Sequence, residues 1–349
     1  MKEKIEKIAR GIGIDIKELF LETPQWGPFH KEGYSLESHI SLMFEVLKNC
    51  LAGVWDGNIS DDVASELQDV AIKKKNLVEQ HIVLHDKAKG NCMTFLYEDG
   101  HTETVTAKEW ETMRAGRPVD DYQSIMKERE VKQISYLQKL PDGSVRTHGR
   151  VAAKELMARG GFDSLLLKGI EMHEIAFQFA SRDGGVNIPL FEKFFSGLSE
   201  EEVLYMLLVN YIDQMACTKD NGQPDISAFL ALLKTWQAWK KLSKVQDFFT
   251  TYSGKVDKKR LDRLLGGLRK DPSAFNNEDI KRVISQFLEK VKISKVDEKT
   301  LRGNLEAVDG LPTDLLENVV EDMLREGQIS SVTGRKLGRF NKAVRELIR

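Results

Sequence analysis

The chain has little of what marks a specialised class of protein. Its 349 residues include only three cysteines, Cys50, Cys92 and Cys217, and no two of them form a CxxC pair. This scarcity excludes a disulfide-stabilised scaffold and is typical of proteins in a reducing compartment. No apolar run reaches the roughly 18 residues that a membrane span requires. With 26 glycines and 8 prolines, the chain is also not collagen-like or of low complexity.

Strong net charge is absent as well. The 52 lysines and arginines nearly balance the 54 aspartates and glutamates, so the net charge is −2 and no global field attracts a polyanion. Hydrophobic residues make up 41% of the chain, enough for a globular core. Residues 1–20 are charged and amphipathic and lack the apolar stretch of a signal peptide. We therefore expect a soluble cytoplasmic protein with no membrane partner.

The distribution of charge predicts two domains. Residues 251–349 carry a net charge of +5, whereas residues 1–250 carry −7. Long apolar runs also thin out near residue 250, where short helices begin to alternate with turns. We predict one domain over residues 1–248 and a small, mildly basic helical domain over residues 249–349. The role of the second domain stays open, and docking of RNA or of a protein would suit its charge.

The periodicity of apolar residues predicts a mainly α fold. Apolar positions recur at helical spacing in six segments, residues 35–51, 61–84, 151–159, 164–180, 200–217 and 226–241. Two segments alternate instead around Asp-Gly pairs, residues 93–110 and 131–148, and this pattern is a strong signal for β-hairpins. We therefore expect a helical bundle with a pair of β-hairpins inserted at about residues 90–147.

One aspartate in the longest apolar helix indicates a site. Asp213 directly follows the run 203–212, whose helix is apolar nearly all round and should be buried. A buried carboxylate costs several kcal/mol unless it is paired or bound to a cation. Histidines on inward helix faces, such as His39 and His173, are candidate neighbours. Imidazole and carboxylate ligands together suit zinc, iron, manganese, cobalt or nickel rather than calcium.

The residues His39, His85, Asp86, His148, His173 and Asp213 follow one another in this order along the chain. The order of their residue types resembles that of the HD-domain superfamily of metal-dependent phosphohydrolases. Lys89 adds to the likeness, because that family often has His-Asp-x-x-Lys as its core motif. Residues 23–33 resemble the entry to the HD domains of bacterial CCA-adding enzymes, and His148-Gly149 resembles the element that opens the next helix there. The likeness covers roughly residues 20–245 and rests on six residues, His39, His85, Asp86, His148, His173 and Asp213.

The resemblance implies an HD-type helical bundle around a binuclear metal centre. One divalent ion would be held by His39, His85, Asp86 and Asp213. Asp86 would bridge to a second ion held by His148 and His173. The ions would be transition metals, namely manganese, iron, cobalt, nickel or zinc. The long gap between Asp86 and His148, which contains both predicted hairpins, departs from the family pattern.

The resemblance also implies a reaction. A metal-activated water would cleave a phosphate ester of a nucleotide or of an RNA end, either a 2′,3′-cyclic phosphate or a terminal phosphomonoester. Asp86 and Lys89 are the candidate catalytic residues. Lys89 is also expected to contact the substrate phosphate, and the further candidates for substrate binding are His30, Arg117, Arg146 and Arg150.

Other interpretations stay open. The chain could be a nucleotide- or RNA-binding adaptor on the same fold, or a di-iron oxygenase. Any single inward histidine could also be an ordinary core residue. His81 lies four residues before His85 but is not followed by the Glu of a zinc-protease motif, so we expect a partly exposed neighbour of the site. Glu174 is expected at the surface or beside the ligands.

Overall fold

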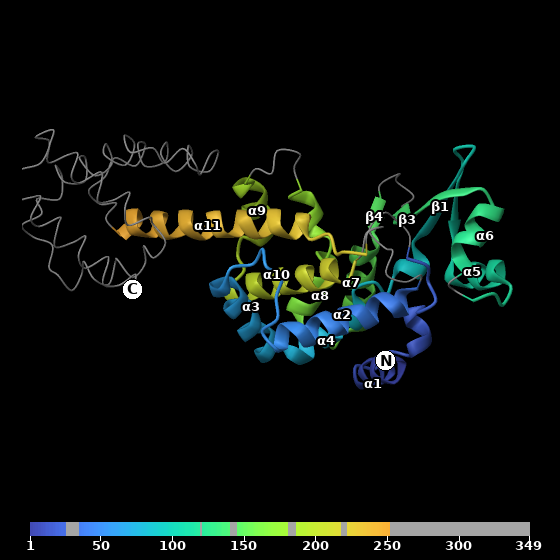
Figure 1. Cartoon of the computed structure of the whole chain (residues 1–349), viewed down its shortest axis with the longest axis horizontal. Helices are drawn as coiled ribbons and strands as arrows, with labels where there is room; N and C mark the ends of the chain where they lie inside the picture. Colours follow the sequence, from blue (N-terminus) through green and yellow to red (C-terminus); the bar gives the residue numbers. More distant parts are fainter. Residues whose placement is uncertain (26–34, 119–120, 140–144, 181–185, 218–221, 252–349) are drawn as a thin grey trace, which may run out of the picture. The chain divides into compact units, whose positions relative to one another are not determined.

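The structure is a computed structural model, and it describes residues 1–25, 35–118, 121–139, 145–180, 186–217 and 222–251 (Figure 1). The chain divides into two compact units. The first comprises Met1–Ser181 and Gly197–Leu232, and the second comprises Arg182–Ser196 and Leu233–Arg349. Three predictions lie outside the described residues. They concern His30, the turn expected at Asp142-Gly143, and the domain expected over residues 249–349 apart from its first three residues.

The first unit is a helical bundle with an inserted sheet. Its helices are α1 (Lys2–Gly11), α2 (Leu36–Leu51), α3 (Asp61–Lys73), α4 (Lys75–Leu84), α5 (Ala107–Arg114), α6 (Tyr122–Glu128), α7 (His148–Arg159), α8 (Ser164–Glu171) and α10 (Glu200–Met215), with the 3-10 turns η1 (Ile16–Leu19), η2 (Lys89–Asn91) and η4 (Ile175–Gln178). The strands are β1 (Met93–Tyr97), β2 (Thr102–Val105), β3 (Val131–Lys139) and β4 (Val145–Thr147). The mainly helical class expected from periodicity is therefore confirmed for the described residues.

Helix α10 lies at the centre of the bundle. Every residue from Val203 to Gln214 is buried, as its all-round apolar sequence predicts. The helix begins at a capping box, in which the Ser199 side chain accepts from the Glu202 amide and Glu202 accepts from the Ser199 amide. Helices α2, α3, α4 and α8 all pack against it. Asp213, near the C-terminal end of α10, is buried with the rest of the helix.

The four strands form one antiparallel sheet in the order β2-β1-β3-β4. Phe95 of β1 lies opposite Ile134 of β3, and Leu137 of β3 lies opposite Thr147 of β4. The predicted hairpins thus exist, but they pair with each other through β1 and β3 instead of standing apart. The short strand β4 leads directly into α7, so the end of the sheet sets the start of that helix.

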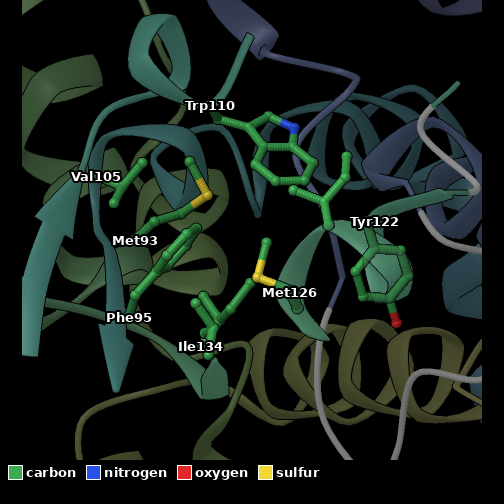
Figure 2. Close-up of a cluster of buried hydrophobic side chains, with 9 residues drawn as sticks. Met93, Phe95, Val105, Trp110, Tyr122, Met126 and Ile134 are labelled. Carbon is green, nitrogen blue, oxygen red and sulfur yellow. The ribbon is translucent and has the colours of Figure 1, made fainter. Parts of the chain in front are cut away.

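The inserted sheet has a hydrophobic core of its own (Figure 2). Met93, Phe95, Val105 and Ile134 project from the strands onto Trp110 of α5 and onto α6. Trp110 is only 1% exposed. We call residues 93–147, which comprise this sheet and α5 and α6, the insertion.

Two local predictions differ from the structure. The segment 61–84 is two helices, α3 and α4, which meet at Lys74. Trp110 lies on a helix and not on the second strand of a hairpin. The strand β2 ends because Thr106 and Glu109 form a capping box that starts α5. This cap stabilises a helix at residues whose alternating sequence pattern alone would favour a strand.

The described part of the second unit consists of α9 (Ile188–Phe195) and most of α11 (Ser227–Thr251), which begins in the first unit. Phe191 stacks on Phe195, with ring centroids 4.4 Å apart, and lies 5.2 Å from the Trp239 ring. These aromatic contacts hold α9 against α11. Among the described residues, no helix is long and apolar enough to cross a membrane.

The buried indole of Trp110 should dominate the stability of the insertion. Trp110→Ala is expected to lower the free energy of unfolding by about 3–5 kcal/mol, because it leaves a large cavity in a closed core. Urea denaturation followed by circular dichroism measures this. The matched control is Phe177→Ala, since Phe177 is 42% exposed. Equal losses in the two variants would contradict the packing described above.

Candidate metal centre

Six side chains meet where five segments of the bundle converge. His39 lies near the start of α2, His85 and Asp86 directly follow α4, His148 is the first residue of α7, His173 follows α8, and Asp213 belongs to α10. All six are buried, with exposed fractions between 0% and 7%. Residues distant in sequence thus share one interior site.

The first part of the site centres on Asp213. His39 Nε2 lies 3.0 Å from Asp213 Oδ1. His85 Nε2 lies 3.9 Å from the same oxygen and 3.3 Å from Asp86 Oδ2. Although His85 is fully buried, its Nε2 has no hydrogen-bond partner in the structure. A buried polar atom of this kind is costly unless it binds something, and a cation would satisfy it.

The second part centres on the other oxygen of Asp86. His148 Nε2 lies 2.9 Å from Asp86 Oδ1, and His173 Nε2 lies 3.5 Å from it. The two Nε2 atoms are themselves 2.9 Å apart. Asp86 therefore faces imidazoles with both of its oxygens.

Backbone carbonyls fix the orientation of three of the imidazoles. The Nδ1 atoms of His85, His148 and His173 lie 3.0, 3.3 and 2.8 Å from the carbonyl oxygens of Ile82, Tyr136 and Ile170, respectively. A carbonyl only accepts, so each Nδ1 donates and each Nε2 is left to bind another group. Histidines that bind metals are usually held in this way.

The donor set therefore fits a metal ion. Two groups of three buried ligand atoms share Asp86, and each is compact enough to hold an ion. One is His39, His85 and Asp86, and the other is Asp86, His148 and His173. Nitrogen and carboxylate donors of this kind favour transition metals over calcium.

Lys89 and Gln25 complete the surroundings of Asp86. Lys89 Nζ lies 2.7 Å from Asp86 Oδ2 and donates to Gln25 Oε1 at 2.7 Å. Gln25 Nε2 in turn donates to Asp86 Oδ2 at 3.3 Å. Gln25 is 0% exposed and Lys89 is 5% exposed, so this arrangement is largely shielded from water.

The electrostatics keep both carboxylates ionised. Burial opposes ionisation of Asp86, but His85 and Lys89 hold its pKa well below the usual range. Burial also opposes ionisation of Asp213, and the hydrogen bond from His39 lowers its pKa nevertheless. Burial lowers the pKa of His85. For His173, the nearby Asp86 carboxylate outweighs burial and raises the pKa to about 9.

Two of the predicted arginines, Arg117 and Arg150, pair with carboxylates that do not belong to this cluster. Arg117 pairs with Glu128 at 2.8 Å within the insertion, and Arg150 lies 3.5 Å from Glu171. Arg146 lies on β4 opposite Gln138. Lys89, in contrast, is buried and its ammonium contacts Asp86 directly.

Sequence reasoning was wrong about His81 and overlooked other neighbours of the site. His81 is completely buried, stacks on His85 with ring centroids 5.7 Å apart, and lies edge-on to Tyr205. Its position one helical turn before His85 places it on the same inward face. Gln25 was noted only as part of residues 23–33 and not as a site residue, and Cys217, whose thiol groups with His39 and Asp213, was not singled out. Only the short separation in sequence between Asp213 and Cys217, which lies two residues beyond the end of α10, could have indicated this.

Comparison of the chain with models of known protein families, with curated proteins and with solved structures finds no match. The conclusion about the site therefore depends on its geometry. Buried histidine and aspartate groups in the first unit could hold a metal ion.

Proposed function

We propose that this chain is a metal-dependent phosphohydrolase whose centre holds two divalent transition-metal ions joined by Asp86. The observation that carries the proposal is the position of the Asp86 carboxylate. Its Oδ2 lies on the side of His85, and its Oδ1 lies on the side of His148 and His173. A carboxylate with different imidazoles at its two oxygens is suited to bridge two ions.

When bound, such ions would lower the pKa of a water and stabilise charge on phosphate oxygens. The residues of the chain prepare the site for this chemistry. The carbonyls of Ile82, Tyr136 and Ile170 hold three imidazoles with Nε2 facing inward, so the ligands need little reorganisation. Burial of Asp86 and Asp213 excludes bulk water and strengthens each charge interaction.

Lys89 is the residue proposed to contact the substrate. The Lys89 ammonium lies beside Asp86 Oδ2. Burial alone would lower the pKa of Lys89, but the Asp86 carboxylate outweighs burial and raises the pKa, so the lysine keeps its charge. A cation at this position can bind an oxygen of a phosphate ester. The further candidates from the sequence are Arg117, Arg146, Arg150 and His30, of which Arg117 and Arg150 already pair with Glu128 and Glu171.

The proposed substrate is a phosphorylated nucleotide or RNA end, with a 2′,3′-cyclic phosphate or a terminal phosphomonoester. This choice rests on the likeness of residues 23–33 and His148-Gly149 to the HD domains of CCA-adding enzymes. The basic segment after residue 250 is consistent with it, since its net charge of +5 would favour an RNA or protein partner.

A screen for phosphate release tests the proposal. The full chain, stripped with a chelator and reloaded separately with manganese, cobalt, nickel, iron or zinc, is offered nucleotides, 2′,3′-cyclic nucleotides and RNA with 3′-terminal phosphate. We expect hydrolysis of at least one class, lost on chelation and restored by the metal. A hydrolase does not consume oxygen, so an oxygen electrode run in parallel distinguishes a di-iron oxygenase.

Two results would reject the proposal. Oxygen-dependent turnover without phosphate release would favour the oxygenase. The adaptor would be favoured by a protein that shows no turnover in any metal and binds nucleotide or RNA. In that case the double variant His85→Ala/Asp86→Ala should bind as well as the wild type.

A further inference from the structure

Residues 21–25, the segment that carries Gln25, are held against the bundle by backbone hydrogen bonds. The Thr23 carbonyl accepts from the Leu36 amide at 2.9 Å, and the Leu21 carbonyl accepts from the Glu37 amide at 2.9 Å. These bonds join the segment to the first turn of α2, three residues before His39. Gln25, at the end of the segment, then reaches both Asp86 and Lys89.

The insertion holds the same segment from another side. Trp110 Nε1 donates to the Glu22 carbonyl at 3.1 Å, and Arg114 pairs with the Glu22 carboxylate. The Tyr136 hydroxyl donates to the Pro24 carbonyl, directly before Gln25. Helix α5 and strand β3 therefore each fix one backbone carbonyl of the segment.

Tyr136 makes two more contacts with the metal centre. Its own carbonyl accepts from His148 Nδ1 at 3.3 Å, and Lys89 Nζ lies 5.1 Å from the centre of its ring. One residue of β3 thus contacts an imidazole ligand, the ammonium beside Asp86 and the backbone that carries Gln25.

We propose that Tyr136 and Gln25 are positioning residues for Asp86, and that the insertion is a fixed part of the metal centre rather than a lid over it. Tyr136 acts through the Pro24 carbonyl, which sets where the Gln25 amide lies. Gln25 donates to Asp86 Oδ2 and accepts from Lys89, and so fixes the carboxylate plane relative to both groups of imidazoles. This inference rests on the metal centre proposed above but is independent of its substrate.

Single substitutions separate these roles. Tyr136→Phe removes only the hydroxyl and keeps the ring over Lys89 and the carbonyl on His148. Gln25→Ala removes both contacts to the Asp86–Lys89 pair. Loss of partners outside the ligand set typically weakens metal binding by about 10- to 100-fold. We expect that range for Gln25→Ala and about a fivefold loss for Tyr136→Phe, which acts indirectly.

The experiment titrates each purified full-length variant with Co²⁺ and follows the visible ligand-field absorption. Tyr97→Phe is the matched control, because Tyr97 is also on the sheet but its hydroxyl donates to the surface residue Glu103. The double variant Tyr136→Phe/Gln25→Ala completes a double-mutant cycle, which measures whether the two residues act independently on Co²⁺ affinity. If Tyr136 acts through Gln25, the double variant should bind Co²⁺ as weakly as Gln25→Ala alone, within about twofold.

The outcomes are distinct. A Tyr136→Phe variant with the affinity and absorption spectrum of Tyr97→Phe would overturn the inference. Losses that multiply in the double variant would overturn the route through Gln25. No Co²⁺ absorption in the wild type would reject the metal centre itself, which is the failure of the proposed function. Thermal unfolding of each variant shows whether a loss of affinity merely follows loss of the fold.

Discussion

Asp86→Asn is expected to lower kcat/KM for phosphate release by about 10³-fold or more, which exceeds the effect typical of residues outside the ligand set. The carboxylate of Asp86 is common to both groups of imidazoles. An amide carries no charge and offers only one oxygen, so it cannot serve both groups. Metal-dependent phosphate release, measured on wild type and variant incubated with the same metal, tests this.

The same substitution has a cost in stability that must be separated from its effect on metal binding. Asp86→Asn leaves the Lys89 ammonium buried without its partner, and breaking a buried ion pair costs about 3–5 kcal/mol. In the double variant Asp86→Asn/Lys89→Met both charges are removed. We expect this variant to regain most of the lost stability in urea denaturation but none of the metal binding.

Asp99→Asn provides the control for Asp86→Asn. Asp99 occupies the exposed turn between β1 and β2, where it accepts from the His101 amide. Asparagine fits such a turn as well as aspartate does. We expect wild-type activity and metal affinity in this control. If Asp86→Asn behaved like Asp99→Asn, the role assigned to Asp86 would be wrong.

Gly149→Ala is expected to disable one half of the centre. A Cβ at this position would lie 2.6 Å from the Ile170 carbonyl oxygen and 2.8 Å from both Nδ1 and Cε1 of His173. These are the two groups whose hydrogen bond holds the His173 ring. The methyl group must displace one of them, so the Asp86–His148–His173 group should lose its metal while the group containing His39 and His85 keeps its own.

Overpacking of this kind also costs about 1–3 kcal/mol of stability. Isothermal titration with Mn²⁺ should give one binding event in Gly149→Ala in place of two. The control is Gly11→Ala at the end of α1, where an added Cβ would meet no atom within 4 Å. Two unchanged binding events in Gly149→Ala would show that the close approach of α7 to His173 is unimportant for the centre.

The sequence was sufficient to predict the features that depend on periodicity and on charge. The apolar run before Asp213 predicts a buried helix, and α10 is buried throughout. A carboxylate placed there requires a partner, and His39 lies 3.0 Å away. Burial and charge pairing act on single helices, so they can be recognised without knowing the tertiary fold.

Features that depend on tertiary contacts could not be predicted in this way. Gln25 lies 61 residues before Asp86 in the sequence, and their contact exists because the insertion holds the backbone at Glu22 and Pro24. The need for glycine at position 149 arises from the approach of α7 to α8, which periodicity does not reveal. The two hairpins were predictable from their turns, but their pairing through β1 and β3 is a long-range contact.

The metal content of the purified full-length chain tests the central claim most directly. Inductively coupled plasma mass spectrometry is applied to wild type, Asp86→Asn and Asp99→Asn after reconstitution with manganese and with cobalt. We expect about two ions per chain in wild type and in Asp99→Asn, and none in Asp86→Asn, because both proposed ion positions share the Asp86 carboxylate. A wild-type chain that retains no transition metal under any of these conditions would contradict the proposed metal centre.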